Sequence, residues 1–148
     1  MRQGIPDAAA PAYEAARRED PKSACGAIGP IHARAAGSKA AVKELQEALK
    51  NAHNAWDKAL GYATLARVYL AMGQNKEAKK AADEALAMGP FSAAAHFASG
   101  LVAMRAKDTQ ELAKLEMQKA VELDPSWAQA RLARGDLLLK DGAPSLPA

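Results

Sequence analysis

Residues 62–90 carry the pattern of two amphipathic helices joined by a short turn. Tyr62 and Tyr69 lie two turns apart on one helix face, and Gly73 follows where a helix is expected to end. A second apolar face then runs to Pro90, which cannot continue a helix. Alanine supplies most of this second face, so the two helices are expected to approach each other closely.

The same pattern returns further along the chain. Ala66, Gly100 and Gly135 recur at intervals of 34 and 35 residues and are expected to lie at equivalent tight helix crossings. The extra residue falls in a predicted turn at 105–108, where an insertion shifts no packed face. The positions of the second helix also recur: Ala78 and Ala113, Ala82 and Met117, Ala85 and Ala120, Pro90 and Pro125.

A period of about 34 residues with small residues at these positions is the signature of the tetratricopeptide repeat. The chain resembles that family over residues 59–142, as two full copies and the first helix of a third. The resemblance implies an all-α fold, a right-handed α-solenoid of antiparallel helix pairs that forms a superhelix. The second copy departs from the pattern, because His96 and Ser99 stand where large apolar residues are usual.

The sequence divides into three predicted segments. Residues 1–58 are expected to form a degenerate N-terminal repeat region, residues 59–142 two full repeats and a terminal helix, and residues 143–148 a disordered tail. Helices are predicted at about 8–20, 39–51, 56–72, 75–88, 92–105, 109–123 and 127–140. Their predicted N-terminal caps are Ser38, Asn75, Ser92 and Ser126, with a capping box formed by Asp108 and Glu111.

Residues 8–20 resemble the second helix of a repeat. Ala9, Tyr13 and Ala16 take the positions of the small residues, and Pro21 takes the position of the closing proline. An alanine-rich amphipathic helix without repeat ancestry explains the segment equally well. On the first interpretation the sequence begins halfway through a repeat, as a fragment of a longer array would.

Charge and composition exclude several classes of function. The net charge of +3 is spread along the chain without a basic block, so we expect no nucleic-acid partner. No apolar run approaches the ~20 residues of a membrane helix, so we expect no membrane insertion. Nothing after Met1 resembles a secretory signal. A complete chain would therefore favour the cytoplasm, and a chain whose leader had been removed would be periplasmic or secreted.

In the family, the first helix of each pair lines a concave surface that binds extended peptides or helices. The resemblance places ten residues of this chain in such a groove, together with Ala94 and Gln129. The groove is largely apolar and implies a protein partner that presents a peptide or an amphipathic helix, with Arg67 as a polar anchor. The ten residues are Leu60, Ala63, Arg67, Leu70, Phe97, Leu101, Met104, Leu132, Asp136 and Leu139.

The leading prediction is therefore a non-enzymatic scaffold or adaptor for protein–protein interaction. The alternative is a structural module, such as a fragment of a larger repeat protein, whose apolar surfaces are covered by its own N-terminal helix or by another copy in a homo-oligomer. The run Leu137, Leu138 and Leu139 favours self-association, because it covers too wide an arc for one packed face.

Residues suited to catalysis or metal binding are sparse, and we expect no enzyme, no metal and no cofactor. His53 and Asp57 are spaced like two metal ligands on a helix, but a solvated pair at a helix start is the simpler interpretation. Cys25 and His32 lack a third catalytic group at a defined spacing. His96 is interpreted as a core histidine, and Trp56 and Trp127 as packing residues at helix starts.

Overall fold

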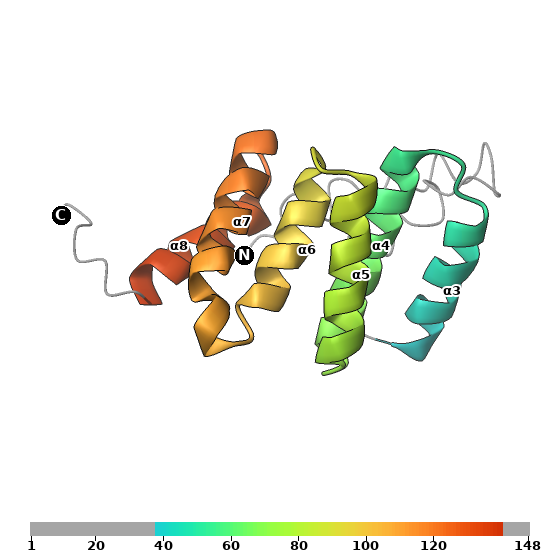
Figure 1. The fold of residues 1–148 in the computed structure, drawn as a ribbon, viewed down its shortest axis with the longest axis horizontal. Coiled ribbons are helices and arrows are strands. Elements are labelled where there is room, and N and C mark those ends of the chain that lie inside the picture. The colour runs from blue at the N-terminus through green and yellow to red at the C-terminus, as the bar shows by residue number, and fades with distance from the viewer. Residues whose placement is uncertain (1–37, 141–148) are drawn as a thin grey trace.

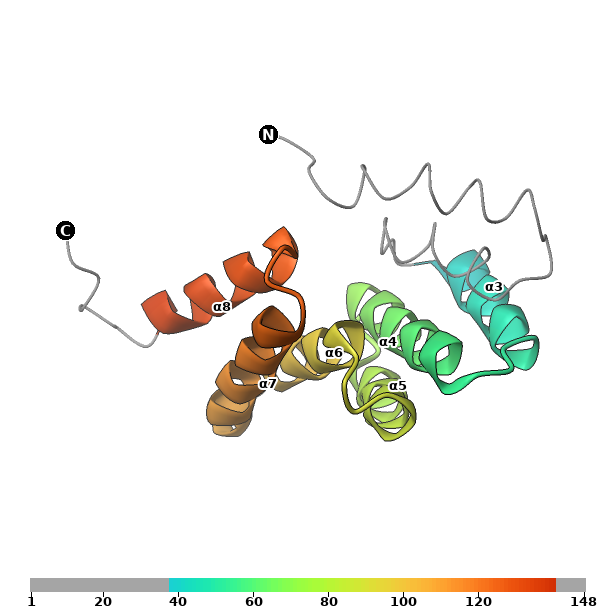
Figure 2. The ribbon, with the colours of Figure 1, turned by 90° about the horizontal axis from the view of Figure 1, so that it is seen from above.

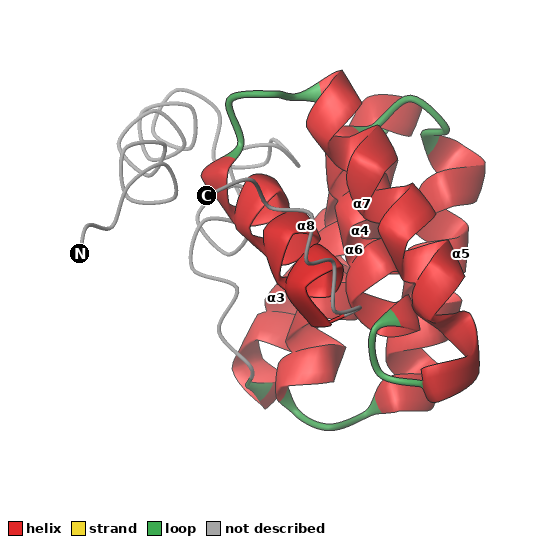
Figure 3. Ribbon diagram, turned by 90° about the vertical axis from the view of Figure 1, so that its left-hand side faces the viewer, coloured by secondary structure: helices red, strands yellow, loops and turns green. Residues whose placement is uncertain are grey.

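The computed structural model describes residues 38–140, and residues 1–37 and 141–148 lie outside the described part. Every regular element in the described part is helical (Figure 3), which confirms the all-α class. In chain order these elements are α3 (Lys39–Lys50), α4 (Ala55–Ala71), α5 (Asn75–Met88), α6 (Ala93–Ala103), the short 3₁₀ helix η1 (Lys107–Thr109), α7 (Gln110–Leu123) and α8 (Ala128–Lys140).

Each described helix begins and ends within two residues of the bounds expected from the sequence. The division of the chain into three segments stays a prediction. The helix expected at 8–20 and the tail at 143–148 lie outside the described residues.

Consecutive helices run in opposite directions and stand side by side in a row (Figure 1). Viewed from above, α4, α6 and α8 lie along one side of the row, and α5 and α7 lie along the other (Figure 2). Each pair packs along its length, α4 with α5 and α6 with α7, and α6 also packs against both members of the preceding pair. The architecture is an α-solenoid of antiparallel helix pairs.

Local sequence signals explain several of the helix ends. The side chains of Ser38 and Ser92 accept hydrogen bonds from the backbone N–H groups of Ala41 (3.0 Å) and Ala95 (3.2 Å), which confirms both predicted caps. Gly73 follows α4 with φ of +76°, a left-handed conformation that glycine adopts without a steric penalty.

Other predicted caps are wrong. Asn75 is already the first residue of α5, and Gln74 precedes it without a side-chain cap bond. Ser126 does not take the N-cap position, because α8 begins at Ala128, and its hydroxyl donates to the carboxylate of Asp124 at 2.6 Å. The expected capping box at Asp108 is absent, since η1 occupies that stretch before α7 begins.

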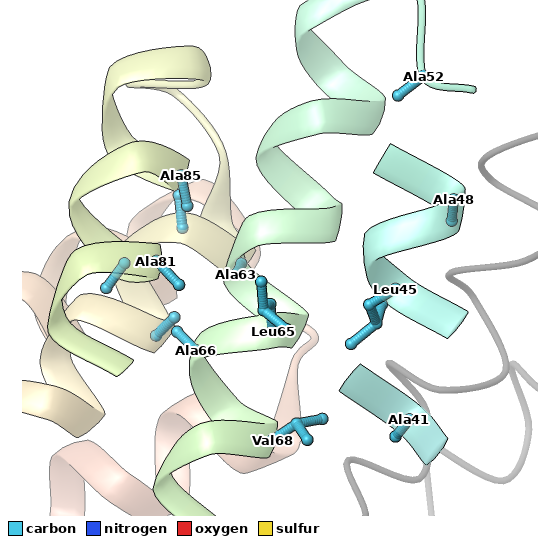
Figure 4. Close-up of a cluster of buried hydrophobic side chains, with 13 residues drawn as sticks. Ala41, Leu45, Ala48, Ala52, Ala63, Leu65, Ala66, Val68, Ala81 and Ala85 are labelled. Carbon is cyan, nitrogen blue, oxygen red and sulfur yellow. The ribbon is translucent and has the colours of Figure 1, made fainter. Parts of the chain in front are cut away.

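Alanine lines most of the interior (Figure 4), as the close approach of the helices requires. One buried cluster joins α3, α4, α5 and α6, and a second joins α6, α7 and α8. Helix α6 contributes to both clusters, with Ala98 in the first and Phe97 in the second. The core is therefore continuous along the row and has no single centre.

Two of the three expected tight crossings are present. Ala66 is fully buried, and a Cβ built on Gly100 would lie 2.9–3.1 Å from three side-chain atoms of Met117 in α7. The expectation is wrong for Gly135, where a Cβ would meet nothing within 4 Å among the described residues. The reason is that no described helix follows α8 to pack over Gly135. Helix α8 also packs against α7 while making little contact with α6.

Candidate protein-interaction surface

The structure places the ten predicted groove residues at different depths. Ala63, Arg67 and Leu70 on α4 and Phe97 on α6 are buried. Leu60 on α4, Leu101 on α6 and Met104 directly after α6 are partly buried, and Leu132, Asp136 and Leu139 on α8 are exposed. All ten lie on the first helices of the pairs or at the C-cap of one, so the surface runs along the α4–α6–α8 side of the row (Figure 2).

The start of α8 closes the middle of this surface. The rings of Phe97 and Trp127 lie 4.5 Å apart between centroids with an interplanar angle of 48°. The guanidinium carbon of Arg67 lies 5.1 Å from the centroid of the same Phe97 ring. An Arg67 Nη2 group also donates a hydrogen bond of 3.1 Å to the Gln129 side-chain oxygen. These four residues connect α4, α6 and the first turn of α8.

Burial changes the electrostatics of this cluster. Desolvation lowers the pKa of Arg67 to about 10, because the charged form loses hydration in the interior. The guanidinium therefore still carries its charge at neutral pH. Arg67 and Phe97 are packed inside the solenoid, whereas the sequence had suggested an open groove with Arg67 as its polar anchor. The involvement of the ten groove residues in partner binding stays a prediction.

The exposed part of the surface lies on α8. Leu132 is 68% exposed and Leu139 is 58% exposed, whereas Leu137 is buried against α7. Part of the leucine run at 137–139 is therefore exposed. Asp136 lies between the two exposed leucines on the same helix face, one turn from each.

His96 is a buried core histidine, as expected, but its partner was not expected from the sequence. Its Nδ1 lies 2.6 Å from a carboxylate oxygen of Glu116, and its Nε2 lies 2.7 Å from the Pro90 carbonyl oxygen. Because a carbonyl can only accept, Nε2 donates to it, and Nδ1 and the carboxylate share a second proton. Glu116 precedes Met117 on the buried face of α7, and that position was the signal in the sequence.

The other residues considered for catalysis or metal binding form no common site in the part of the chain that the structure describes. Among residues 38–140 no group of three metal-binding side chains forms. Asp57 instead receives a hydrogen bond from the side-chain nitrogen of Asn54 at 3.2 Å. Cys25 and His32 lie outside the described residues. Trp127 is buried as predicted, but Trp56 is largely exposed, so its assignment as a packing residue is wrong.

An open hollow of about 410 Å³, not expected from the sequence, lies between α4 and α5. Tyr62, Leu65 and Tyr69 line it from α4. The remaining lining residues are on α5: Glu77, Lys80, Ala81 and Glu84. Acidic and basic groups both border the hollow, so it favours neither anions nor cations.

Comparisons with known proteins agree with the α-solenoid architecture. Residues 63–126 match the family model described as the tetratricopeptide repeat. Residues 63–126 contain tetratricopeptide repeats. Among solved structures it is similar to a thermophilic tetratricopeptide repeat protein of Thermus thermophilus, with a TM-score of 0.68 and 20% sequence identity. The alignment covers 94% of this chain and 76% of the other, and at that identity it concerns the fold.

A search of curated proteins gives no match to the chain. Tetratricopeptide repeats are in general non-catalytic scaffolds for protein interaction. None of the helices between residues 38 and 140 is both long and apolar enough to cross a bilayer.

Proposed function

We propose that the chain is a non-enzymatic adaptor that binds an amphipathic helix or apolar peptide of a partner protein along α6 and α8. The observation that carries this proposal is the exposure of Leu132 and Leu139 on the side of the row formed by α4, α6 and α8. Leucines this exposed on one helix face are unfavourable in water unless another molecule covers them.

The partly buried Leu101 and Met104 extend this apolar surface onto α6. Helices α6 and α8 make little direct contact with each other. A ligand helix can therefore lie against both of them without breaking a contact between them. We define Leu101, Met104, Leu132 and Leu139 as the α6–α8 surface. It is apolar along its length, and it suits a ligand with leucines or aromatic residues at helical spacing.

The only predicted groove charge that is exposed is Asp136, between Leu132 and Leu139. A basic residue of the ligand would pair with this carboxylate at the rim of the contact. Such a pair in water contributes little affinity, about 0–1 kcal/mol, but it sets the direction in which the ligand lies. The buried Arg67 is not available for the same purpose.

The test compares two leucine substitutions on opposite sides of the row. Leu132→Glu removes an apolar contact from the α6–α8 surface, whereas Leu115→Glu changes a leucine of α7 that is 47% exposed. The partner is first identified by capture and mass spectrometry, and its binding is then measured by calorimetry with purified proteins. We expect Leu132→Glu to weaken binding at least about tenfold, as the loss of one buried leucine implies.

Leu115→Glu should leave binding unchanged, and circular dichroism should show both variants folded with similar melting temperatures. Equal weakening by both substitutions, or by neither, would exclude the α6–α8 surface. Phe97 is unsuitable for this experiment, because its ring is buried against Trp127 and a charge there would disrupt the fold.

A further inference from the structure

One stripe of α6 shows how the second helix of a pair covers the first. His96 contacts Glu116 of α7, and Gly100 lies under Met117 of α7. At the next turn the Ala103 carbonyl accepts a hydrogen bond of 2.6 Å from the Thr109 hydroxyl, just before α7. His96, Gly100 and Ala103 are all buried, so this stripe is the face of a first helix that its partner helix covers.

Within residues 38–140, the same three positions of α8, 35 residues later, have no such cover. Arg131 is exposed, Gly135 has nothing within 4 Å among the described residues, and Leu138 is 40% exposed. We call Arg131, Gly135 and Leu138 the open stripe of α8. It lies on a different side of α8 from the buried residues Ala130 and Leu137, and it contains none of the leucines of the α6–α8 surface.

Helices α3, α5 and α7 share one spacing of buried residues. In each helix three buried residues are separated by four and then by three positions, and the first and third of them are alanine. In two of the three helices a proline follows the last alanine by five residues. The sets are Ala41, Leu45 and Ala48 in α3; Ala78, Ala82, Ala85 and then Pro90 in α5; Ala113, Met117, Ala120 and then Pro125 in α7.

In the full sequence, the spacing that ends in proline occurs once more. Ala9, Tyr13 and Ala16 are followed by Pro21 at the same intervals as in α5 and α7. Tyr13 takes the position of Met117, which in α7 lies over the glycine of the stripe. Segment 9–21 therefore has the residues of a covering helix, with a side chain that can pack over Gly135.

We propose that segment 9–21 of a second copy packs on the open stripe of α8. In the order of the repeats this segment belongs before α3, and α3 and α8 lie at opposite ends of the row (Figure 1). Two copies placed head to tail bring the segment of one next to α8 of the other and complete a helix pair from two chains. Each contact uses different surfaces of the two copies, so the association continues beyond a dimer.

A disulfide test uses two single-cysteine proteins in a Cys25→Ser background, which removes the one native cysteine. One protein carries Tyr13→Cys and the other carries Gly135→Cys, so only a contact between chains can join them. We expect the disulfide between Tyr13→Cys and Gly135→Cys to form at least about tenfold faster than the disulfide between Tyr13→Cys and Asp136→Cys. Asp136 is the control position, because it is exposed and adjacent to Gly135 but points in another direction from α8.

Equal rates for Gly135→Cys and Asp136→Cys, or no mixed disulfide, would overturn the proposal. A chain that carries both Tyr13→Cys and Gly135→Cys gives a second check. If it closes an internal disulfide at high dilution and forms no dimer, the segment covers its own α8, and the assignment to a second copy is wrong.

Sedimentation velocity tests the same contact without cross-linking. Tyr13→Glu and Leu138→Glu should each weaken self-association at least about tenfold, while a mixture of the two variants should stop at a dimer, because each supplies the surface that the other lacks. Leu132→Glu should not change self-association, which separates this contact from the α6–α8 surface. A wild-type chain that stays monomeric at all concentrations would refute the proposal.

Discussion

Gly100 and Gly135 allow one substitution to be compared at two equivalent positions. Both glycines lie inside helices at the same place in the repeat, but among the residues that the structure describes only Gly100 has a neighbour over it. Replacement by alanine should therefore act through backbone propensity alone at Gly135. At Gly100 it should act through both propensity and packing.

The structure sets the sign and size of the two effects. Alanine in a helix interior is more favourable than glycine by about 1 kcal/mol, so Gly135→Ala should raise the melting temperature by about 2–4 °C. At Gly100 the new Cβ would lie 2.9–3.1 Å from three atoms of Met117, which is fully buried. Overpacking costs about 1–3 kcal/mol, so Gly100→Ala should be neutral to destabilising by about 2 kcal/mol.

Urea unfolding of the wild type and both variants provides the measurement, at concentrations where sedimentation shows monomers. A Met117→Ala background supplies the control, because it removes the three atoms that the new Cβ would meet. In that background Gly100→Ala should become stabilising. If Gly100→Ala stabilises the wild type as much as Gly135→Ala does, the crossing at Gly100 is not tight and the packing argument fails.

Three further predictions concern caps and buried charges. Ser92→Ala should cost about 1 kcal/mol through loss of the cap on α6, while Ser126→Ala, which caps no helix, should change little; thermal melts compare the two. His96→Ala should cost about 3–5 kcal/mol in urea unfolding, because it leaves the Glu116 carboxylate buried without its partner, and replacing both residues by leucine should cost less. Because burial lowers the pKa of Arg67 to about 10, the folded chain releases this proton at lower pH than the unfolded chain does. Stability relative to Arg67→Met should therefore stay constant up to about pH 9 and rise above about pH 10, and a fall above that pH would contradict the assignment.

The sequence was sufficient to predict the helices and their pairing. Periodic apolar faces depend on neighbours within the same helix, and the interval of 34–35 residues transfers one pair onto the next. Serine caps were predicted correctly at Ser38 and Ser92, where the next residues already form the helix. The cap prediction is wrong at Ser126, whose hydroxyl donates to the carboxylate of Asp124 two residues earlier.

The depth of the groove residues could not be predicted from the same pattern. Phe97 and Arg67 are buried because Trp127 and Gln129, from the next pair, lie over them. That contact depends on how α8 turns relative to α6, and the repeat pattern treats every pair as equivalent. Helix α8 is the element that departs from this equivalence, and most of the differences between expectation and structure lie around it.

The attachment of α8 through α7 and its own first turn also affects its local dynamics. In a repeat array each helix is stabilised mainly by its neighbours, so α8 can detach while the helices before it stay folded. Amide hydrogens of α8 should therefore exchange with solvent faster than those of α4 or α6. Any molecule that bridges α6 and α8 would slow this exchange along the whole of α8, including turns that it does not touch.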